Sequence, residues 1–178
     1  MRSAHGTRRL PLGAWVRDAG GASDAPQETV VEGATVAARA LADRFPRTPA
    51  ATAASAATLF AGCSYQWGGV TPWGADCSGF VQAVYRLHGV ELPRDAWQQA
   101  LEGDDAGSAI DALAPGDLLF FSDRDDLRIT HVGVALGESR MAHVSLGRGG
   151  FAVERLDDAR DAYAARLVRQ LRATRRVV

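Results

Sequence analysis

Apolar residues recur at helical spacing along the first half of the chain. Two alanine-rich segments, residues 28–45 and 49–62, place apolar side chains three or four positions apart, which predicts two consecutive helices. Pro46 and Pro49 mark the break between them. Because proline cannot continue a helix interior, the first helix must end before the second begins.

A third helix is predicted directly after a glycine-rich loop. Residues 77–88 carry apolar side chains on one helical face, and Gly89 supplies the glycine that often ends a helix. Residues 90–103 predict another short helix. The apolar face of the third helix consists of Phe80, Val81, Val84 and Leu87.

From residue 117 the pattern changes to short apolar and β-branched runs separated by turn residues. These runs cover residues 117–121, 131–137, 140–146 and 151–156. Two further segments follow, which predict a helix over 157–166 and a closing strand over 167–177. Helices followed by a run of strands indicate an α+β fold, in which helices pack on an antiparallel sheet of about five or six strands.

Composition and charge restrict the possible partners. Of the 178 residues, 47% are hydrophobic and 23% are charged, and the net charge is -1. We therefore expect neither nucleic acid nor an anionic membrane surface as a partner. The sequence contains no apolar run long enough to span a membrane, and its first residues lack the apolar core of a secretory signal. We expect a cytoplasmic protein and a monomer.

Cys77 stands at the junction between the glycine-rich loop and the third predicted helix. A thiol reacts as its thiolate, which the unpaired N–H groups and dipole of a helix N-terminus favour. The same N–H groups can hold an oxyanion. This placement predicts a reactive cysteine with a lowered pKa, and the alternative is a small buried apolar side chain. With only Cys63 besides Cys77, the chain has no disulfide framework.

The histidines add a candidate base and an orienting group. His131 and His143 fall in successive predicted strands, so antiparallel pairing could bring them side by side. His88 ends the Cys77 helix, and we interpret it as a capping residue. A zinc site made of Cys63, Cys77, His131 and His143 is an alternative, but the short spacings typical of structural zinc sites are missing. We expect no metal and no cofactor.

Four motifs, taken in order, resemble the NlpC-type cell-wall cysteine endopeptidases: YQWGG…GADCSGFVQAVYRLHGVELPRD, LAPGDLLFF, HVGVALG and MAHVS. The resemblance covers residues 50–177. It implies a papain-like fold and cleavage of the bond between the γ-carboxyl of D-glutamate and a diamino acid in peptides of bacterial peptidoglycan. It also implies that Cys77 is the nucleophile, His131 the base and His143 the group that orients it, with Tyr65 near the oxyanion.

The resemblance further suggests where the substrate binds. Asp76 and Ser78 match residues that hold a free N-terminal amine in some relatives, although Asp76 is alternatively a helix N-cap. Arg94 and Asp95 end the first motif and are assigned to substrate binding as well. Trp67 either walls the cleft or packs beneath the glycine-rich loop.

Two features depart from the family pattern. Ala96 and Trp97 stand where relatives often carry serines that contribute to the pocket. Residues 8–17 predict a short strand with a turn, and residues 8–16 resemble the tail of a bacterial SH3-like module. We therefore divide the chain into a remnant with linker, 1–26, and a papain-like peptidase domain, 27–178. Alternatives to a peptidase are an amidase or acyltransferase on the same fold, and a catalytically silent wall-binding module.

Overall fold

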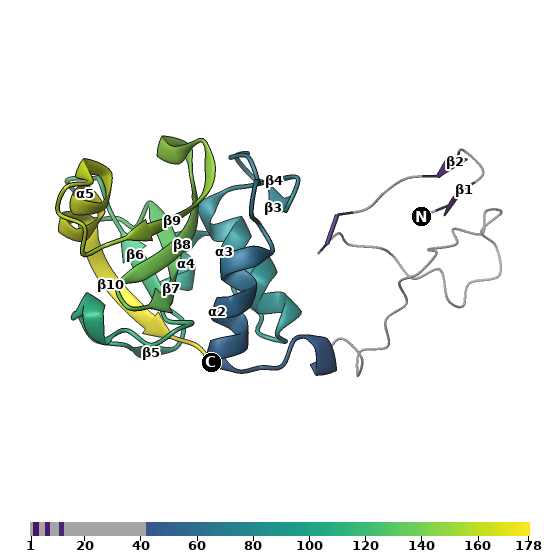
Figure 1. Ribbon diagram of the computed structural model, residues 1–178, viewed down its shortest axis with the longest axis horizontal. Helices are drawn as coiled ribbons and strands as arrows, with labels where there is room; N and C mark the ends of the chain where they lie inside the picture. Colours follow the sequence, from purple (N-terminus) through teal and green to yellow (C-terminus); the bar gives the residue numbers. More distant parts are fainter. Residues whose placement is uncertain (1, 4–5, 8–10, 13–41) are drawn as a thin grey trace.

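The structure is a computed structural model that describes residues 2–3, 6–7, 11–12 and 42–178 (Figure 1). Its first two strands, Arg2–Ser3 (β1) and Gly6–Thr7 (β2), pair with each other in antiparallel fashion. Three predictions fall largely outside the described residues: the strand over 8–17, the SH3-like remnant over 1–26 and the helix over 28–45.

The predicted α+β architecture is confirmed, because helices pack on a six-stranded antiparallel sheet in the order β5-β10-β6-β7-β8-β9. The strands are Asp104–Asp105 (β5), Leu118–Phe121 (β6), His131–Gly137 (β7), Arg140–Ser145 (β8), Gly150–Arg155 (β9) and Leu171–Arg176 (β10). The helices are Pro49–Thr58 (α2), Cys77–Leu87 (α3), Ala96–Gln99 (α4) and Ala162–Gln170 (α5), with 3-10 turns at Ile110–Ala112 (η1) and Leu146–Arg148 (η2). A short hairpin, Val70–Thr71 (β3) and Gly74–Ala75 (β4), precedes α3. This hairpin and β5 were not predicted.

Helix α3 begins and ends where its sequence predicts. Asp76 is the N-cap, and its carboxylate accepts the backbone N–H of Gly79 at 2.8 Å. This bond satisfies one of the donors that a helix start leaves free. At the other end His88 is the C-cap, and Gly89 adopts a left-handed conformation with φ of 72°, which is open to glycine at little cost.

His88 also ties α3 to the preceding helix. One ring nitrogen, Nδ1, lies 2.7 Å from the carbonyl oxygen of Pro46, and Nε2 lies 2.8 Å from the hydroxyl of Ser55 in α2. The ring of Phe45 meets the imidazole edge to face, with centroids 5.5 Å apart. The predicted capping residue is therefore a buried contact between two helices as well.

Side-chain alternation along the central strands divides the apolar residues between two faces of the sheet. One set packs with α2 and α3: Leu118, Phe120, Val132, Val134, Ala142 and Val144. The other set packs with Leu167 of α5: Leu119, Phe121, Ala135 and Met141. Helices α3 and α5 therefore cover opposite faces of the sheet (Figure 1).

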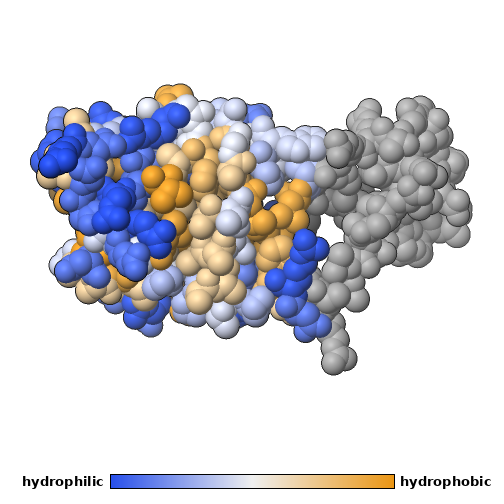
Figure 2. Space-filling model, viewed as in Figure 1, coloured by the Kyte–Doolittle hydropathy of each residue, from blue (hydrophilic) through white to orange (hydrophobic). Residues whose placement is uncertain are grey.

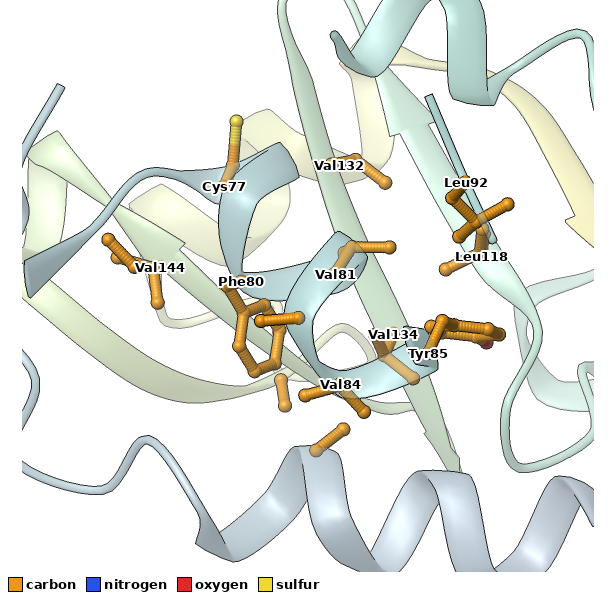
Figure 3. Close-up of a cluster of buried hydrophobic side chains, with 14 of the residues drawn as sticks. Cys77, Phe80, Val81, Val84, Tyr85, Leu92, Leu118, Val132, Val134 and Val144 are labelled. Atoms are coloured by element: carbon orange, nitrogen blue, oxygen red, sulfur yellow. The ribbon is translucent and has the colours of Figure 1, made fainter. Parts of the chain in front are cut away.

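The core between α3 and the sheet holds the first turn of this helix in place (Figure 3). Phe80 is fully buried, and its ring meets those of Phe60 and Phe151 edge to face, with centroids 5.1 and 6.0 Å away. Truncating a buried ring of this size costs about 3–5 kcal/mol. Cys77 lies at the edge of this cluster, and its sulfur points away from the apolar side chains (Figure 3).

Figure 2 shows an apolar band over α2. Alanines such as Ala50 and Ala54 occupy exposed positions on the outer side of this helix. Apolar side chains thus lie on both the inner and outer sides of this helix. Within the described part of the chain, no helix is long and apolar enough to cross a membrane.

Candidate active site

A cleft of about 1070 Å³ opens at the N-terminal end of α3. Its walls come from the glycine-rich loop, the first turn of α3, the segment around α4, the start of β7 and part of α5. The predicted site residues that line it are Tyr65, Trp67, Asp76, Cys77, Ser78, Arg94, Asp95 and His131. His143 is fully buried next to His131 and does not line the cleft.

Cys77 is the first residue of α3, and three backbone N–H groups lower the pKa of its thiol. They belong to Cys77 itself, to Ser78 and to Val132, the residue that follows His131. Such donors can stabilise a thiolate, or an oxyanion that forms beside the sulfur. The fold thus brings the N-terminus of α3 to the first residues of β7.

The prediction of a lowered thiol pKa is wrong for the resting site. Burial raises the pKa of Cys77, and the charge of Asp76 raises it further, whereas the N–H groups of Val132, Ser78 and Cys77 lower it. Because Cys77 is only 9% exposed, these donors do not outweigh the loss of water around a thiolate. At neutral pH the resting group is a thiol, so a base must take its proton.

The two histidines meet on adjacent strands, as the sequence predicts. His131 opens β7 and His143 lies in β8, with His131 Nε2 and His143 Nδ1 2.8 Å apart. Phe121, opposite His131 on β6, packs against its ring with centroids 5.8 Å apart. These contacts fix the imidazole and leave Nδ1 as the nitrogen that His143 does not use.

His131 is unprotonated in the resting site. Loss of water around the ring, and secondarily the neighbouring His143, lower the pKa of His131 to about 3. An imidazole with so low a pKa is neutral at pH 7 and has a free lone pair. The cleft therefore combines a protonated thiol with an unprotonated base.

Asp76 is buried, and both its oxygens accept hydrogen bonds. Oδ1 accepts from the N–H of Gly79 at 2.8 Å and from Arg94 at 3.0 Å, and Oδ2 accepts from the N–H of Gly68 at 2.8 Å and from Arg94 at 2.6 Å. Burial would raise the pKa of Asp76, but Arg94 and the backbone donors lower it overall. Arg94 also donates to the hydroxyl of Ser78 at 2.9 Å. The N-cap role of Asp76 is therefore present, and its charge is balanced by Arg94 within the protein.

Tyr65 lines the cleft near Cys77 and Asp76. Burial raises the pKa of Tyr65, and the charge of Asp76, together with that of Cys77 when it is a thiolate, raises it further. Its hydroxyl therefore keeps its proton at neutral pH and can donate a hydrogen bond to a developing oxyanion.

The remaining substrate-binding candidates lie at the rim of the cleft. Trp67 is 85% exposed, so it does not pack beneath the loop. Asp95 is exposed, and its carboxylate makes no hydrogen bond or ion pair with the residues that the structure describes. Arg128 packs over the ring of Trp97 at 5.5 Å, which adds an aromatic and cationic surface beside α4.

Sequence reasoning missed a buried acidic residue next to the histidines. Glu154 of β9 is 4% exposed, and its Oε1 lies 3.2 Å from His143 Nε2. Arg148 donates to both carboxylate oxygens, at 2.7 and 2.8 Å, and also contacts Asp161, the N-cap of α5. A glutamate in the middle of an apolar strand run, residues 151–156, is the sequence signal that could have indicated it.

Cys63 lies apart from this site. It is 4% exposed, does not line the cleft, and its Sγ donates to the carbonyl of Ser64 at 3.3 Å. In the part of the chain that the structure describes, no three His, Cys, Asp or Glu side chains gather as a metal site, so geometry does not support the zinc alternative.

A cysteine at a helix start and a histidine at the start of a strand in an antiparallel sheet line one cleft, an arrangement that fits the papain-like class of fold. The model of the NlpC/P60 family matches residues 62–172. The chain therefore belongs to the NlpC/P60 family of peptidases.

Individual relatives agree with this assignment. The chain is 41% identical over 86 residues to the γ-D-glutamyl-L-lysine dipeptidyl-peptidase of Bacillus subtilis. The matched region covers 48% of this chain and 28% of that protein. A crystal structure of an NlpC/P60 family protein from Bacillus cereus matches with a TM-score of 0.55 and 29% identity, over 64% of this chain and 35% of that one. The NlpC/P60 domain of the peptidoglycan hydrolase SagA matches with a TM-score of 0.53 and 30% identity, over 61% of this chain and 90% of that one. The chain spans 28%, 25% and 34% of the length of the first three curated relatives.

Proposed function

We propose that the protein is a thiol peptidase that hydrolyses the bond between the γ-carboxyl of D-glutamate and a diamino acid in peptides derived from bacterial peptidoglycan. The observation that carries the proposal is that Cys77, the first residue of α3, and His131, the first residue of β7, line the same cleft. The name of the Bacillus subtilis relative, γ-D-glutamyl-L-lysine dipeptidyl-peptidase, supports the choice of bond.

The proposed reaction starts from the thiol and the neutral imidazole. The thiol proton moves to His131 Nδ1 as the sulfur of Cys77 attacks the carbonyl carbon of the scissile amide. The C–N bond then breaks, the departing nitrogen takes the proton from His131, and a thioester remains on Cys77. Water adds to the thioester carbon and gives a proton to His131. The sulfur leaves with that proton, and the product departs as a carboxylic acid.

The charge that develops on the carbonyl oxygen needs donors already in place. The N–H groups of Cys77 and Ser78 at the first turn of α3 face the sulfur and would reach an oxygen bound to the adjacent carbon. The protonated hydroxyl of Tyr65 lines the same space. We assign Tyr65 and this helix turn to the oxyanion, and His143 to the orientation of His131.

Substrate recognition would use the rim of the cleft. Asp95 lines the cleft and its carboxylate has no hydrogen bond or ion pair among the described residues, so it can accept a free N-terminal ammonium. Asp76, Arg94 and Ser78 form a bonded cluster below it and would present a polar floor to the peptide. Trp67 would cover one side of the bound peptide.

The test is mass spectrometry of products after incubation with L-Ala-γ-D-Glu-diamino acid peptides and, separately, intact wall. Cys77→Ala should abolish hydrolysis of the γ-glutamyl bond, because the thioester cannot form. Cys63→Ala is the matched control and should retain activity. Hydrolysis that survives in Cys77→Ala would exclude the proposal, and cleavage only between glycan and peptide would indicate an amidase instead.

A further inference from the structure

Three side chains lie in a row behind Cys77, and the last of them is acidic. His131 Nε2 is 2.8 Å from His143 Nδ1, and His143 Nε2 is 3.2 Å from Glu154 Oε1. His143 and Glu154 are buried, at 0% and 4% exposure. The row crosses three adjacent strands, because β7, β8 and β9 are neighbours in the sheet.

The protons in this row can be placed by counting donors and acceptors. A carboxylate only accepts, so His143 must carry its proton on Nε2, the nitrogen that faces Glu154. A second proton on His143 Nδ1 would make His131 Nε2 the acceptor and put the proton of His131 on Nδ1. Without that second proton, His143 Nδ1 accepts, His131 donates from Nε2, and His131 Nδ1 is left with a lone pair. We propose that Glu154 is a positioning residue, which sets the tautomers of His143 and His131 so that Nδ1 of His131 is free to take the thiol proton of Cys77.

Arg148 keeps Glu154 ionised and in one orientation. It donates from Nε to Oε1 at 2.7 Å and from a second nitrogen to Oε2 at 2.8 Å, a two-bond geometry that fixes the plane of the carboxylate. Burial would raise the pKa of Glu154, but hydrogen bonds from His143 and Arg148 lower it to about 2. The group therefore stays a pure acceptor at every pH at which the enzyme would work.

The other groups around the row do not compete for its protons. The ring of Tyr163, from α5, lies 6.0 Å from that of His143, and its hydroxyl bonds to Ser145. Arg148 stacks over the same tyrosine at 4.4 Å and contacts Asp161. Phe121 covers His131 from β6. Glu154 is the acceptor that reaches His143 Nε2 among the described residues.

The expected effect of Glu154 on kcat rests on the proposed function, but the placement of the protons does not. Proton placement is a property of the free protein and can be read without substrate. Two-bond ¹⁵N–¹H spectra of histidine distinguish the tautomers, and we expect both His131 and His143 of the unmodified protein as the Nε2–H form at neutral pH. A proton on Nδ1 of His131 would overturn the proposal, whatever the protein cleaves.

Two variants separate the hydrogen bond from the rest of the side chain. Glu154→Gln retains an oxygen that can accept from His143, so the tautomers should persist and kcat should fall about tenfold through the lost charge. Glu154→Ala removes the acceptor, so the tautomers should mix and kcat should fall about 100-fold, with KM little changed. Glu138→Gln is the matched control, since Glu138 is also paired with an arginine, Arg140, but is exposed and away from the cleft.

A second readout needs no peptide. It is the rate at which iodoacetamide alkylates Cys77, measured at several pH values in the Cys63→Ala background. Glu154→Ala should slow labelling at neutral pH by a similar factor, and Glu154→Gln should restore most of it. If Glu154→Ala keeps both tautomers and labels like Glu138→Gln, the proposal is wrong. If Glu154→Gln is as damaging as Glu154→Ala while both retain the tautomers, Glu154 has no positioning role. If the tautomers are as expected but the protein does not cleave the peptide, only the proposed function is rejected.

Discussion

Arg94 holds the carboxylate of Asp76 through two parallel hydrogen bonds, Nη1 to Oδ1 at 3.0 Å and Nη2 to Oδ2 at 2.6 Å. The Asp76 side chain is only 8% exposed and that of Arg94 33% exposed. The same carboxylate caps α3 through Gly79 and accepts the N–H of Gly68 in the loop. One ion pair therefore joins the glycine-rich loop, the start of α3 and the segment before α4, which together form a wall of the cleft.

We expect Asp76→Asn to lower the free energy of unfolding by about 1–3 kcal/mol, because an amide cannot accept all four hydrogen bonds and Arg94 loses its partner. Urea denaturation would measure the change. Asp126→Asn is the matched control, since Asp126 pairs with Arg124 in the same two-bond geometry but on the exposed surface, and it should cost little. Equal losses in the two variants would show that the Asp76 pair is not a structural anchor.

The substrate amine gives a second prediction. Asp76 already has a cation, whereas the Asp95 carboxylate lines the cleft without a hydrogen bond or ion pair among the described residues. N-acetylation of the peptide should therefore reduce kcat/KM in the wild type by about 10- to 100-fold, the range of a charge-assisted hydrogen bond. Asp95→Asn should remove most of this discrimination, and Asp76→Asn should leave more of it. Wild-type protein that cleaves both peptides equally well would exclude an amine pocket.

The sequence predicted the central sheet because strands β6 to β9 are apolar runs bounded by turn residues, and it predicted α3 because Phe80, Val81 and Val84 share a face. It did not predict β5 or the β3–β4 hairpin, since strands of two residues carry no periodic pattern. Such elements form because their neighbours pair with them, as β10 does with β5.

The candidate site was predictable only where residue types reveal chemistry. Cys77, His131 and His143 stand out by type and order, whereas Glu154 stands out only as a charge within an apolar run and Arg148 resembles an ordinary surface residue in the sequence. The position of Glu154 beside His143 follows from the pairing of β8 with β9, in which Met141 faces Glu154 and His143 faces Ala152. The thiol pKa was predicted wrongly because a helix start can be read from the sequence but the burial of Cys77 cannot.

Gly79 provides a prediction about packing at the first turn of α3. A Cβ at this position would lie 2.1 Å from the carbonyl oxygen of Gly69 and 3.1 Å from the Asp76 carboxylate. Because the nearest atom belongs to the backbone, Gly79→Ala must push the loop away from the helix start. We expect a loss of about 2 kcal/mol or more in stability and a large fall in kcat/KM.

Gly107→Ala is the control for this substitution. Gly107 does not line the cleft, and a Cβ at this position would stand in open space. Because its φ is 88°, alanine would cost only the strain of a left-handed backbone, about 1 kcal/mol. Activity should stay near wild type. Wild-type activity in Gly79→Ala would mean that contact between loop and helix does not shape the site.

From the low pKa of His131 we predict how the stability of the protein changes in acid. Its pKa is about 3 in the folded protein and about 6.5 for an ordinary histidine. Above pH 6.5 the ring is neutral in both states and its contribution to stability is complete. As the pH falls from 6.5 towards 3, His131 binds a proton in the unfolded chain but not in the folded protein. Stability should therefore fall by up to about 1.4 kcal/mol per pH unit from this group.

Urea denaturation at pH 7, 6 and 5 would measure that slope in a range where carboxylates scarcely titrate. His131→Asn keeps a polar side chain of similar size but removes the titration, so its stability should depend less on pH over the same range. The difference between the two slopes isolates His131 from the other histidines, because they are present in both proteins. Glu138→Gln, an exposed change in a residue that does not line the cleft, should parallel the wild type. Equal slopes in wild type and His131→Asn would show that the pKa of His131 is not lowered in the folded protein.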